Sequence, residues 1–284
     1  MSRPDPAPPG TPPSALSRAL ALLPRASSVT EAVPSNPRGA VTLVGVGPGD
    51  PDLLTVAALR AIAAATVVAY PVARVGGEGM AARIAAPWLA PCQRRLPLLF
   101  PMVEAAEPRR EAWHHAAAIL AAEAERGERL VLLCEGDASL FASCSYALLA
   151  LAERHPSCPL RVVPGISAVA AAAAAASSQG LPWPLALQRE GLLIRPTPET
   201  PAGLARLLDE AAASATVLAL LKLGRRWRWV RPRLEERGLL EPALFASRVG
   251  WPDQRLVPAV AVPADEQPYF SLLLLRQSWP DVLP

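Results

Sequence analysis

The chain has 284 residues and 51% of them are apolar, so it is long enough for one large or two moderate domains with packed cores. Its formal net charge of +3 is too small to indicate a nucleic-acid-binding protein by itself, and only 5% of the residues are aromatic. No segment reaches the ~18 uninterrupted apolar residues of a membrane helix. The N-terminus also lacks the pattern of a signal peptide. We therefore expect a cytoplasmic protein that binds neither membrane nor nucleic acid.

The four cysteines are not spaced as metal ligands usually are, and no histidine accompanies them in a recognisable pattern. Cys134 lies in an apolar run, where we expect it to serve as a small core residue. We therefore expect neither a bound metal nor a disulfide, and reduced cysteines suit the cytoplasm.

Residues 1–38 are rich in proline, serine and alanine, a composition that cannot bury enough apolar surface to offset the entropy lost on ordering. We expect a disordered extension, in which residues 17–23 are the one stretch with a helical pattern. The globular part begins abruptly at residue 39.

The first globular segment alternates apolar strands with helices, which is typical of a mostly parallel α/β sheet. Asp50 and Pro51 are suited to begin its first helix, as the N-cap and the first helical residue. In chain order we expect a strand at 40–46, a helix at 53–65, a strand at 66–70, helices at 79–88 and 108–126, a strand at 129–134, a helix at 139–154, a strand at 160–163 and an alanine-rich helix after it.

A second segment follows a boundary that we place between residues 179 and 187, so the predicted domains are 39–182 and 183–284. Its final apolar run, 269–275, is expected to be an edge or antiparallel strand. The elements before it are expected to be a strand at 192–195, a helix at 201–213, a strand at 216–222, a helix at 227–237 and a strand at 243–247.

Three glycine turns each follow a predicted strand and precede a helix. They are Gly45–Asp50, Glu135–Asp137 and Pro164–Ser167. In open α/β sheets ligands bind beyond the carboxyl ends of strands, and glycine lets them approach backbone N–H groups closely. Neither a dinucleotide fingerprint nor a P-loop is present. Each turn alone is equally well explained as an ordinary tight connection, but together they favour a small-ligand site.

These three turns resemble the signature motifs of the tetrapyrrole methylases: VGVGPGDPDLLT from Val44, EGD from Glu135 with Phe141 and Ser143 after it, and VVPGISA from Val162. The resemblance spans about residues 40–277. It implies two α/β domains with S-adenosylmethionine bound in the cleft between them, no metal, and usually a homodimer. The residues that it implies for the donor site are Pro48, Glu135, Gly136, Asp137, Leu140, Ser167, Ala168, Leu221 and Val249.

Further segments resemble the branch of the family that methylates precorrin-2 at C20, a tetrapyrrole acceptor of cobalamin biosynthesis. They include VAYP from Val68, LKLGR from Leu221, SRVG from Ser247 and YFSLLL from Tyr269. Pro71 stands where the uroporphyrinogen-methylating branch has an aspartate, which argues against that acceptor. Ala138 replaces the proline of the central motif, and Leu221 replaces a common methionine.

The residues that bind the acceptor or move a proton cannot be assigned from the sequence. Asp50 and Tyr70 are candidates for handling a proton, but a helix cap and a core tyrosine explain them as well. Arginine suits the acceptor's carboxylates. The candidate arginines follow the strand at 216–222 or flank the other loops, and we expect two or three of them to touch the acceptor: Arg225, Arg226, Arg228, Arg231, Arg233, Arg94, Arg95, Arg109 and Arg110.

Three alternatives remain open from the sequence. A cobalt-containing acceptor, cobalt-factor II, has nearly the same outline as the metal-free one. RNA ribose methylation uses the same fold, but it would favour a basic stripe with stacking aromatics. A donor-binding protein that has lost turnover would keep Asp137 and Ser167.

Overall fold

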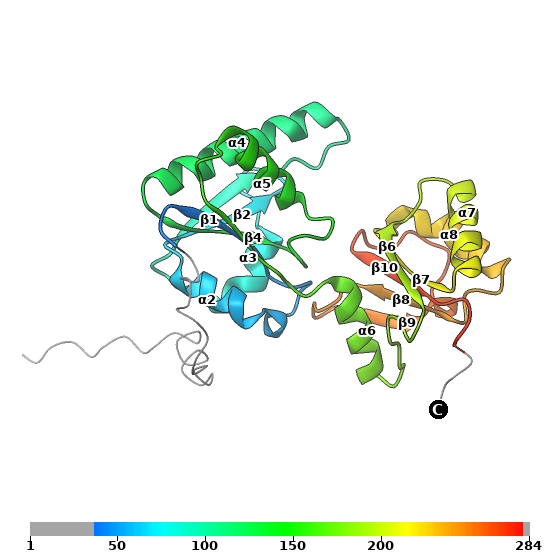
Figure 1. Cartoon of the computed structure of the whole chain (residues 1–284). Coiled ribbons are helices and arrows are strands. Elements are labelled where there is room, and N and C mark those ends of the chain that lie inside the picture. Colours follow the sequence, from blue (N-terminus) through cyan, green and yellow to red (C-terminus); the bar gives the residue numbers. More distant parts are fainter. Residues whose placement is uncertain (1–36, 281–284) are drawn as a thin grey trace, which may run out of the picture. The chain divides into compact units, whose positions relative to one another are not determined.

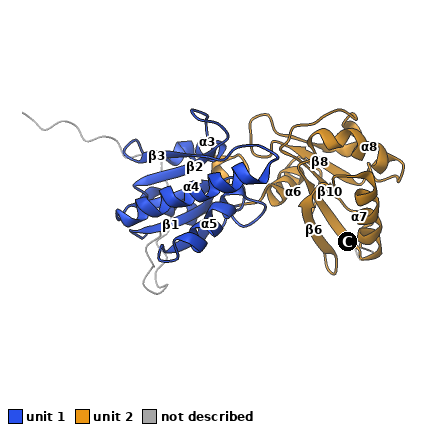
Figure 2. Cartoon of the chain, turned by 90° about the horizontal axis from the view of Figure 1, so that it is seen from above, with its two compact units in different colours: residues 1–46, 54–165 blue, residues 47–53, 166–284 orange. Residues whose placement is uncertain are grey.

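The computed structural model describes residues 37–280, which form two compact units, each built around a five-stranded sheet (Figures 1 and 2). Of the described residues, unit 1 contains 37–46 and 54–165, whereas unit 2 contains 47–53 and 166–280. The predicted class, two α/β domains, is confirmed. The disorder predicted for residues 1–38 falls almost wholly on residues outside the described part.

Unit 1 has an all-parallel sheet with the strand order β3-β2-β4-β1-β5. Such a sheet needs apolar strands and a helix in most connections, and the sequence supplies both. Its elements are β1 (Ala40–Gly45), α2 (Val56–Ala64), β2 (Val67–Val72), α3 (Met80–Ala85), η2 (Ala86–Trp88), β3 (Arg94–Leu99), α4 (Ala106–Glu125), β4 (Arg129–Cys134), α5 (Ser143–Arg154) and β5 (Leu160–Val163).

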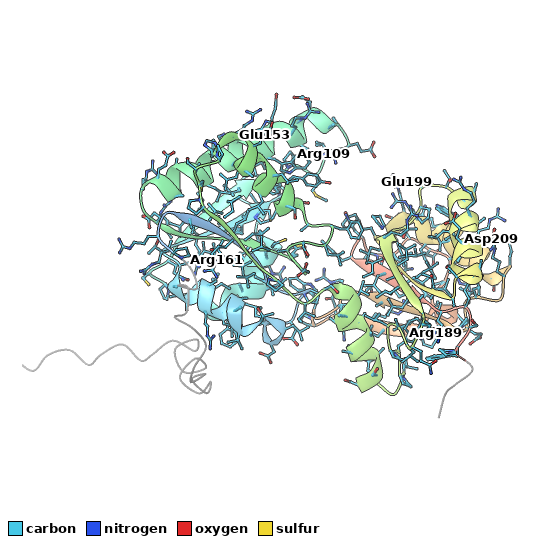
Figure 3. The ribbon with its side chains drawn as sticks, in the orientation of Figure 1. Arg109, Glu153, Arg161, Arg189, Glu199 and Asp209 are labelled. Atoms are coloured by element: carbon cyan, nitrogen blue, oxygen red, sulfur yellow. The ribbon has the colours of Figure 1, made fainter. Side chains whose placement is uncertain are left out.

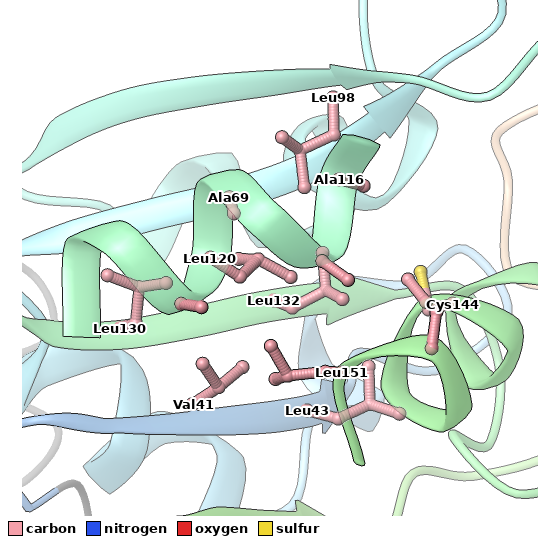
Figure 4. Close-up of a cluster of buried hydrophobic side chains, with 14 of the residues drawn as sticks. Val41, Leu43, Ala69, Leu98, Ala116, Leu120, Leu130, Leu132, Cys144 and Leu151 are labelled. Carbon is pink, nitrogen blue, oxygen red and sulfur yellow. The ribbon is translucent and has the colours of Figure 1, made fainter. Parts of the chain in front are cut away.

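The core of unit 1 fills the space between its sheet and the helices α4 and α5 (Figure 4). Alternate residues of β1 and β4, such as Val41 and Leu132, are fully buried there against Leu120 of α4 and Leu151 of α5. Every residue of β1 is buried, as expected for a strand with both faces covered. This packing holds the carboxyl ends of β1 and β4 in fixed positions.

Unit 2 has a mixed sheet with the strand order β6-β7-β10-β8-β9. β6 and β7 are parallel, and β10 runs antiparallel to both β7 and β8. The elements are η1 (Pro51–Leu53), α6 (Ala168–Ser178), β6 (Gly191–Pro196), α7 (Pro201–Ala213), β7 (Thr216–Leu221), η3 (Gly224–Arg226), α8 (Trp227–Glu235), β8 (Ala243–Ser247), β9 (Arg255–Pro258), η4 (Ala259–Ala261) and β10 (Ser271–Leu275).

Two strands were missed in the sequence, and both lie at an edge of their sheet. β3 carries Pro97 in its middle and β9 ends at Pro258. Proline cannot donate to a neighbouring strand, so it is tolerated at edges and hides the usual strand pattern. β10 is antiparallel as expected, but it lies in the centre of its sheet and not at an edge.

Two helices begin later than expected. The N-cap of α2 is Thr55, whose Oγ1 accepts the Ala58 N–H at 3.1 Å, so the prediction that Asp50 caps this helix was wrong. Asp50 instead accepts the Asp52 N–H at 2.8 Å, in the short turn η1. Helix α5 begins at Ser143, four residues after the predicted start at Ser139.

The helix α6 packs with unit 2, although the predicted boundary lies after it. The predicted domain bounds, 39–182 and 183–284, stay a prediction. What the contacts show is that the chain passes from unit 1 to unit 2 after Gly165.

Candidate functional site

Three glycines meet at the carboxyl ends of adjacent strands in unit 1. Gly45 ends β1, Gly136 follows β4 and Gly165 follows β5. A Cβ on Gly45 would lie 2.6 Å from the Gly165 nitrogen and 2.8 Å from the Gly136 oxygen, and a Cβ on Gly165 would overlap that same oxygen. Because no side chain fits among them, the three turns pack backbone to backbone. The sheet edge therefore presents main-chain groups that a ligand can approach closely.

Asp137 ties two of these turns together. Its Oδ2 accepts the Gly165 N–H at 2.9 Å, while its Oδ1 accepts the Ser139 N–H at 2.9 Å and the Ser139 hydroxyl. Partial burial raises the pKa of Asp137, but the hydrogen bonds from Ser139 and Gly165 outweigh it and hold the pKa below its usual value. The carboxylate is therefore ionised near neutral pH. Asp137 does not cap α5, since that helix begins well after it.

Glu135 precedes this turn and differs from Asp137 in its surroundings. Its side chain is half-buried, and among the described residues its carboxyl group makes no hydrogen bond or ion pair. Burial raises the pKa of Glu135 to about 7. The pKa values of the two neighbouring carboxyl groups are thus shifted in opposite directions, and Glu135 can accept or release a proton near neutral pH.

The thiols behind this turn belong to the core. Cys134 and Cys144 are both buried, and the Cys144 thiol lies 3.5 Å from the Leu133 oxygen. The prediction that Cys134 is a core residue is confirmed. A side-chain hydrogen bond with Cys134, followed by burial, raises the pKa of Cys144 well above its usual value, so this thiol stays protonated.

The first glycine turn continues from Gly45 into residues 47–53, and this segment packs within unit 2. A Cβ on Gly49 would lie 2.6 Å from the Trp251 ring and 2.7 Å from the Val249 oxygen. The indole N–H of Trp251 donates to the Pro48 oxygen at 3.0 Å. Trp251, which follows the SRVG segment, was missed in the sequence because a lone aromatic residue after a turn gives no signal of what it contacts.

The other residues predicted for the donor site in unit 2 lie around one apolar cluster. Val249 is buried in it, whereas Ala168 and Leu221 are partly buried at its margin. Ser167 is the N-cap of α6, and its Oγ accepts the Ala170 N–H at 3.2 Å. The Leu221 oxygen accepts both the N–H and the hydroxyl of Thr197 at 2.8 Å, which fixes the end of β7.

The predicted site residues therefore form two sets. Those of unit 1 are contiguous along the chain, from Glu135 to the half-buried Leu140. Those of unit 2 are brought together by folding, and they are Pro48, Ser167, Ala168, Leu221 and Val249. The structure places every one of them at the end of a strand, in a loop or at a helix N-terminus.

Tyr70, a candidate for proton handling, lies within β2 and is half-buried. Its ring packs directly over Gly79, where a Cβ would overlap it. Asp50 lies in the turn of unit 2, and its backbone nitrogen would be 2.5 Å from a Cβ on Gly250.

Most of the candidate arginines make hydrogen bonds or ion pairs within the protein; Figure 3 draws the side chains and labels one of these arginines, Arg109. Arg109 and Arg95 donate to backbone oxygens of Ala105 and Ala90 at 3.2 Å. Among the described residues, Arg225 makes no hydrogen bond or ion pair and is exposed. The arginines that pair with carboxylates are Arg94 with Glu123, Arg110 with Glu107, Arg226 with Glu199, Arg228 with Glu266, Arg231 with Glu235 and Arg233 with Glu236.

Within residues 37–280, no three His, Cys, Asp or Glu side chains come together as metal ligands would. None of the helices described there is long and apolar enough to cross a membrane.

Comparison with curated proteins finds relatives among enzymes of tetrapyrrole metabolism. The chain is 34% identical over 246 residues to the cobalamin biosynthesis protein CobIJ of Mycobacterium bovis, covering 84% of this chain but only 46% of that protein, so it spans about half the length of this relative. It is 30% identical to the cobalt-precorrin-2 C(20)-methyltransferase of Salmonella typhimurium, covering 85% of this chain and 98% of the relative. It is 31% identical to the precorrin-2 C(20)-methyltransferase of a Sinorhizobium species, covering 84% of this chain and 95% of the relative.

The fold is also that of solved structures. The uroporphyrin-III C-methyltransferase of Thermus thermophilus, crystallised with S-adenosyl homocysteine, superimposes with a TM-score of 0.54 at 26% sequence identity, covering 84% of this chain and 97% of that one. The sequence model of the tetrapyrrole (corrin/porphyrin) methylases matches residues 40–262, from the first strand of unit 1 to the η4 turn of unit 2. All three glycine turns lie within the match, and the chain therefore belongs to the tetrapyrrole (corrin/porphyrin) methylases.

Proposed function

We propose that this protein is an S-adenosylmethionine-dependent methyltransferase that methylates precorrin-2 at C20, giving precorrin-3A in cobalamin biosynthesis. The observation that carries this proposal is the pair of relatives matched almost end to end, which are named for methylation at C20 of precorrin-2 or cobalt-precorrin-2.

We propose that the donor binds at the glycine turns described above. In unit 1 it would contact Glu135, Gly136, Asp137 and Leu140, because the glycine cluster leaves the main chain accessible there. Ser139 and Gly165 use three of the roughly four lone pairs of the Asp137 carboxylate, and the one left on Oδ2 can accept a hydrogen bond from a ribose hydroxyl. The residues proposed in unit 2 are Pro48, Ser167, Ala168, Leu221 and Val249.

The chemistry demands alignment more than activation. The electron pair of the acceptor carbon forms the new bond to the methyl carbon while the bond from that carbon to sulfur breaks, leaving a neutral thioether. A proton then has to leave the methylated carbon of the acceptor. Rigid turns that hold the donor in line supply the alignment. Glu135, whose pKa burial raises to about 7, is a carboxyl group of unit 1 that can exchange a proton near neutral pH.

The direct test is transfer of label from S-adenosylmethionine to a panel of acceptors: metal-free precorrin-2, its cobalt form and uroporphyrinogen III. We expect a product methylated at C20 with precorrin-2, identified by NMR, and none with uroporphyrinogen III. The Salmonella relative favours the cobalt form as a second candidate acceptor. Faster turnover of that form would reassign the acceptor, and no transfer to any of them would refute the proposed enzyme.

The donor site is tested separately with Asp137→Ala. Loss of a charged acceptor costs roughly 1.5–3 kcal/mol, so we expect S-adenosylmethionine to bind tenfold to a hundredfold more weakly by calorimetry. Ser139→Ala is the matched control, because it removes one partner of Asp137 and leaves the carboxylate in place. If Asp137→Ala lowers the melting temperature but binds the donor as wild type does, Asp137 only ties the two turns together.

The remaining expectations about the whole protein, a homodimer located in the cytoplasm, are proposals that follow from the family. Light scattering on the purified chain tests the first of them.

A further inference from the structure

One edge of the sheet in unit 2 gathers cations that the sequence reasoning did not single out. β7 and β8 lie on either side of β10 and run antiparallel to it, so their carboxyl ends are at the same edge. Lys222 follows the last residue of β7, and Arg248 follows the last residue of β8. Two strand spacings separate them, which places their backbones about 10 Å apart.

Both residues have a backbone conformation that long side chains rarely adopt. The φ angle is 59° at Lys222 and 48° at Arg248, in the left-handed region that favours glycine or asparagine. Surrounding contacts hold both in place: Arg226 donates to the Lys222 oxygen at 3.2 Å, and the Arg248 N–H donates to the Phe270 oxygen at 2.8 Å. A strained backbone of this kind persists where surrounding contacts hold it, and such residues are frequent at ligand-binding sites.

The side chains of Lys222 and Arg248 both keep hydrogen-bond donors that can bind an anion. Among the described residues no carboxylate pairs with Lys222, whose Nζ lies 5.8 Å from the centre of the Tyr269 ring. Arg248 stacks over Trp251 at 5.1 Å and uses its Nε for the exposed Asp253. Its terminal nitrogens make no hydrogen bond to any residue of the described part of the chain, so they can bind a second anion.

Aromatic surface lies between the two cations. Tyr269 and Phe270 directly precede β10, are 47% and 43% exposed, and pack edge to face at 5.2 Å between ring centres. Arg225 is close by, because the Gly224 oxygen accepts the Gln267 N–H at 3.2 Å in the segment before these aromatics.

The carboxylates facing this edge are already engaged or lie at its margin. Glu199 pairs with Arg226, and Glu266 pairs with Arg228. Asp253 is held by Arg248, and Asp50 lies in the turn beside Gly250. Lys222 and Arg225 are then the cations of this edge that pair with no carboxylate of the described residues, and Lys222 lies next to an exposed aromatic ring.

We infer that Lys222 and Arg248 form a subsite for two carboxylates of a polycarboxylated tetrapyrrole, with Tyr269 and Phe270 supplying an apolar surface to the macrocycle between them. This rests on the proposed function for the identity of the acceptor, and it selects different residues from the arginine groups considered in the sequence. Two cations on flanking strands suit a ligand with several carboxylates on one rigid frame better than a single small anion.

Binding of uroporphyrin III, which carries a carboxylate on every side chain, tests this without turnover. The change in intrinsic tryptophan fluorescence reports binding, since Trp251 stacks beneath Arg248. Asparagine tolerates the left-handed backbone, so Lys222→Asn and Arg248→Asn remove the charge with little strain. We expect each to weaken uroporphyrin binding at least fivefold and to reduce its dependence on salt, while the affinity for S-adenosylmethionine stays within twofold.

Two controls separate charge from folding. Lys222→Arg keeps the charge and should bind uroporphyrin nearly as wild type does, whereas Arg206→Gln removes one exposed cation from α7 and should change nothing. Equal binding by wild type and the two asparagine variants would overturn the inference, as would the absence of uroporphyrin binding by wild type or equal loss in Lys222→Arg. If binding is lost as expected but no precorrin-2 is methylated, the subsite stands and the proposed reaction fails.

Discussion

Replacing Glu135 by glutamine should remove one part of the dependence of folding stability on pH. The folded-state pKa of Glu135 is about 7 against an ordinary 4.5. A carboxyl group with a raised pKa contributes stability that is fully present below pH 4.5 and is lost as the pH rises to about 7. This difference corresponds to roughly 3 kcal/mol at most, and because the side chain keeps some solvent access we expect about 1–3 kcal/mol. Above pH 7, therefore, Glu135→Gln should be more stable than wild type by about that amount, relative to their difference at pH 4.

Urea unfolding of both proteins between pH 4 and pH 8.5 measures this difference. Asp137→Asn is the matched control, because hydrogen bonds hold the pKa of Asp137 below 3.8 and its difference from wild type should therefore stay constant over this pH range. The stability that Asp137 contributes is present above its ordinary pKa and is lost as the pH falls below that value. Parallel curves for wild type and Glu135→Gln across this range would refute the assignment of a half-buried, unpaired carboxyl group directly after β4.

Three further predictions concern the scaffold. Arg276 is 1% exposed and pairs with the buried carboxylate of Glu190 at 2.7 Å. Arg276→Ala should lower the free energy of unfolding by about 3–5 kcal/mol, which urea unfolding followed by tryptophan fluorescence measures. Gly165→Ala should lower both the melting temperature and the donor affinity, because the added Cβ has no room beside the turn at Gly136. The control Gly203→Ala, within α7, should melt near wild type. Equal melting temperatures for the two variants would contradict the backbone packing of the turns. Ser167→Ala and Thr200→Ala each remove a helix N-cap, and each should lower the free energy of unfolding by ~1 kcal/mol. Only Ser167→Ala should weaken S-adenosylmethionine binding in calorimetry. Equal donor binding by both variants would remove Ser167 from the site.

The local pattern of the sequence was sufficient for the class of fold and for most elements. β4, β5, α7 and β8 have the predicted bounds, because an apolar run between turn residues or a proline at a helix start is a local signal. The family could also be identified from the residues alone, since its motifs are contiguous stretches of chain. The edge strand β3 was missed because Pro97 interrupts its local pattern. What makes it a strand is its pairing with β2, which the local sequence does not show.

Only the tertiary structure decided which groups meet. Asp137 and Gly165 are 28 residues apart, and the hydrogen bond between them depends on β4 and β5 both flanking β1. The raised pKa of Glu135 depends on what covers it, which spacing along the chain does not report. Lys222 and Arg248 share an edge because β10 lies between their strands, although nothing in their local sequence connects them. Motifs are local and therefore readable, whereas burial, charge pairing and the meeting of strand ends are products of long-range packing.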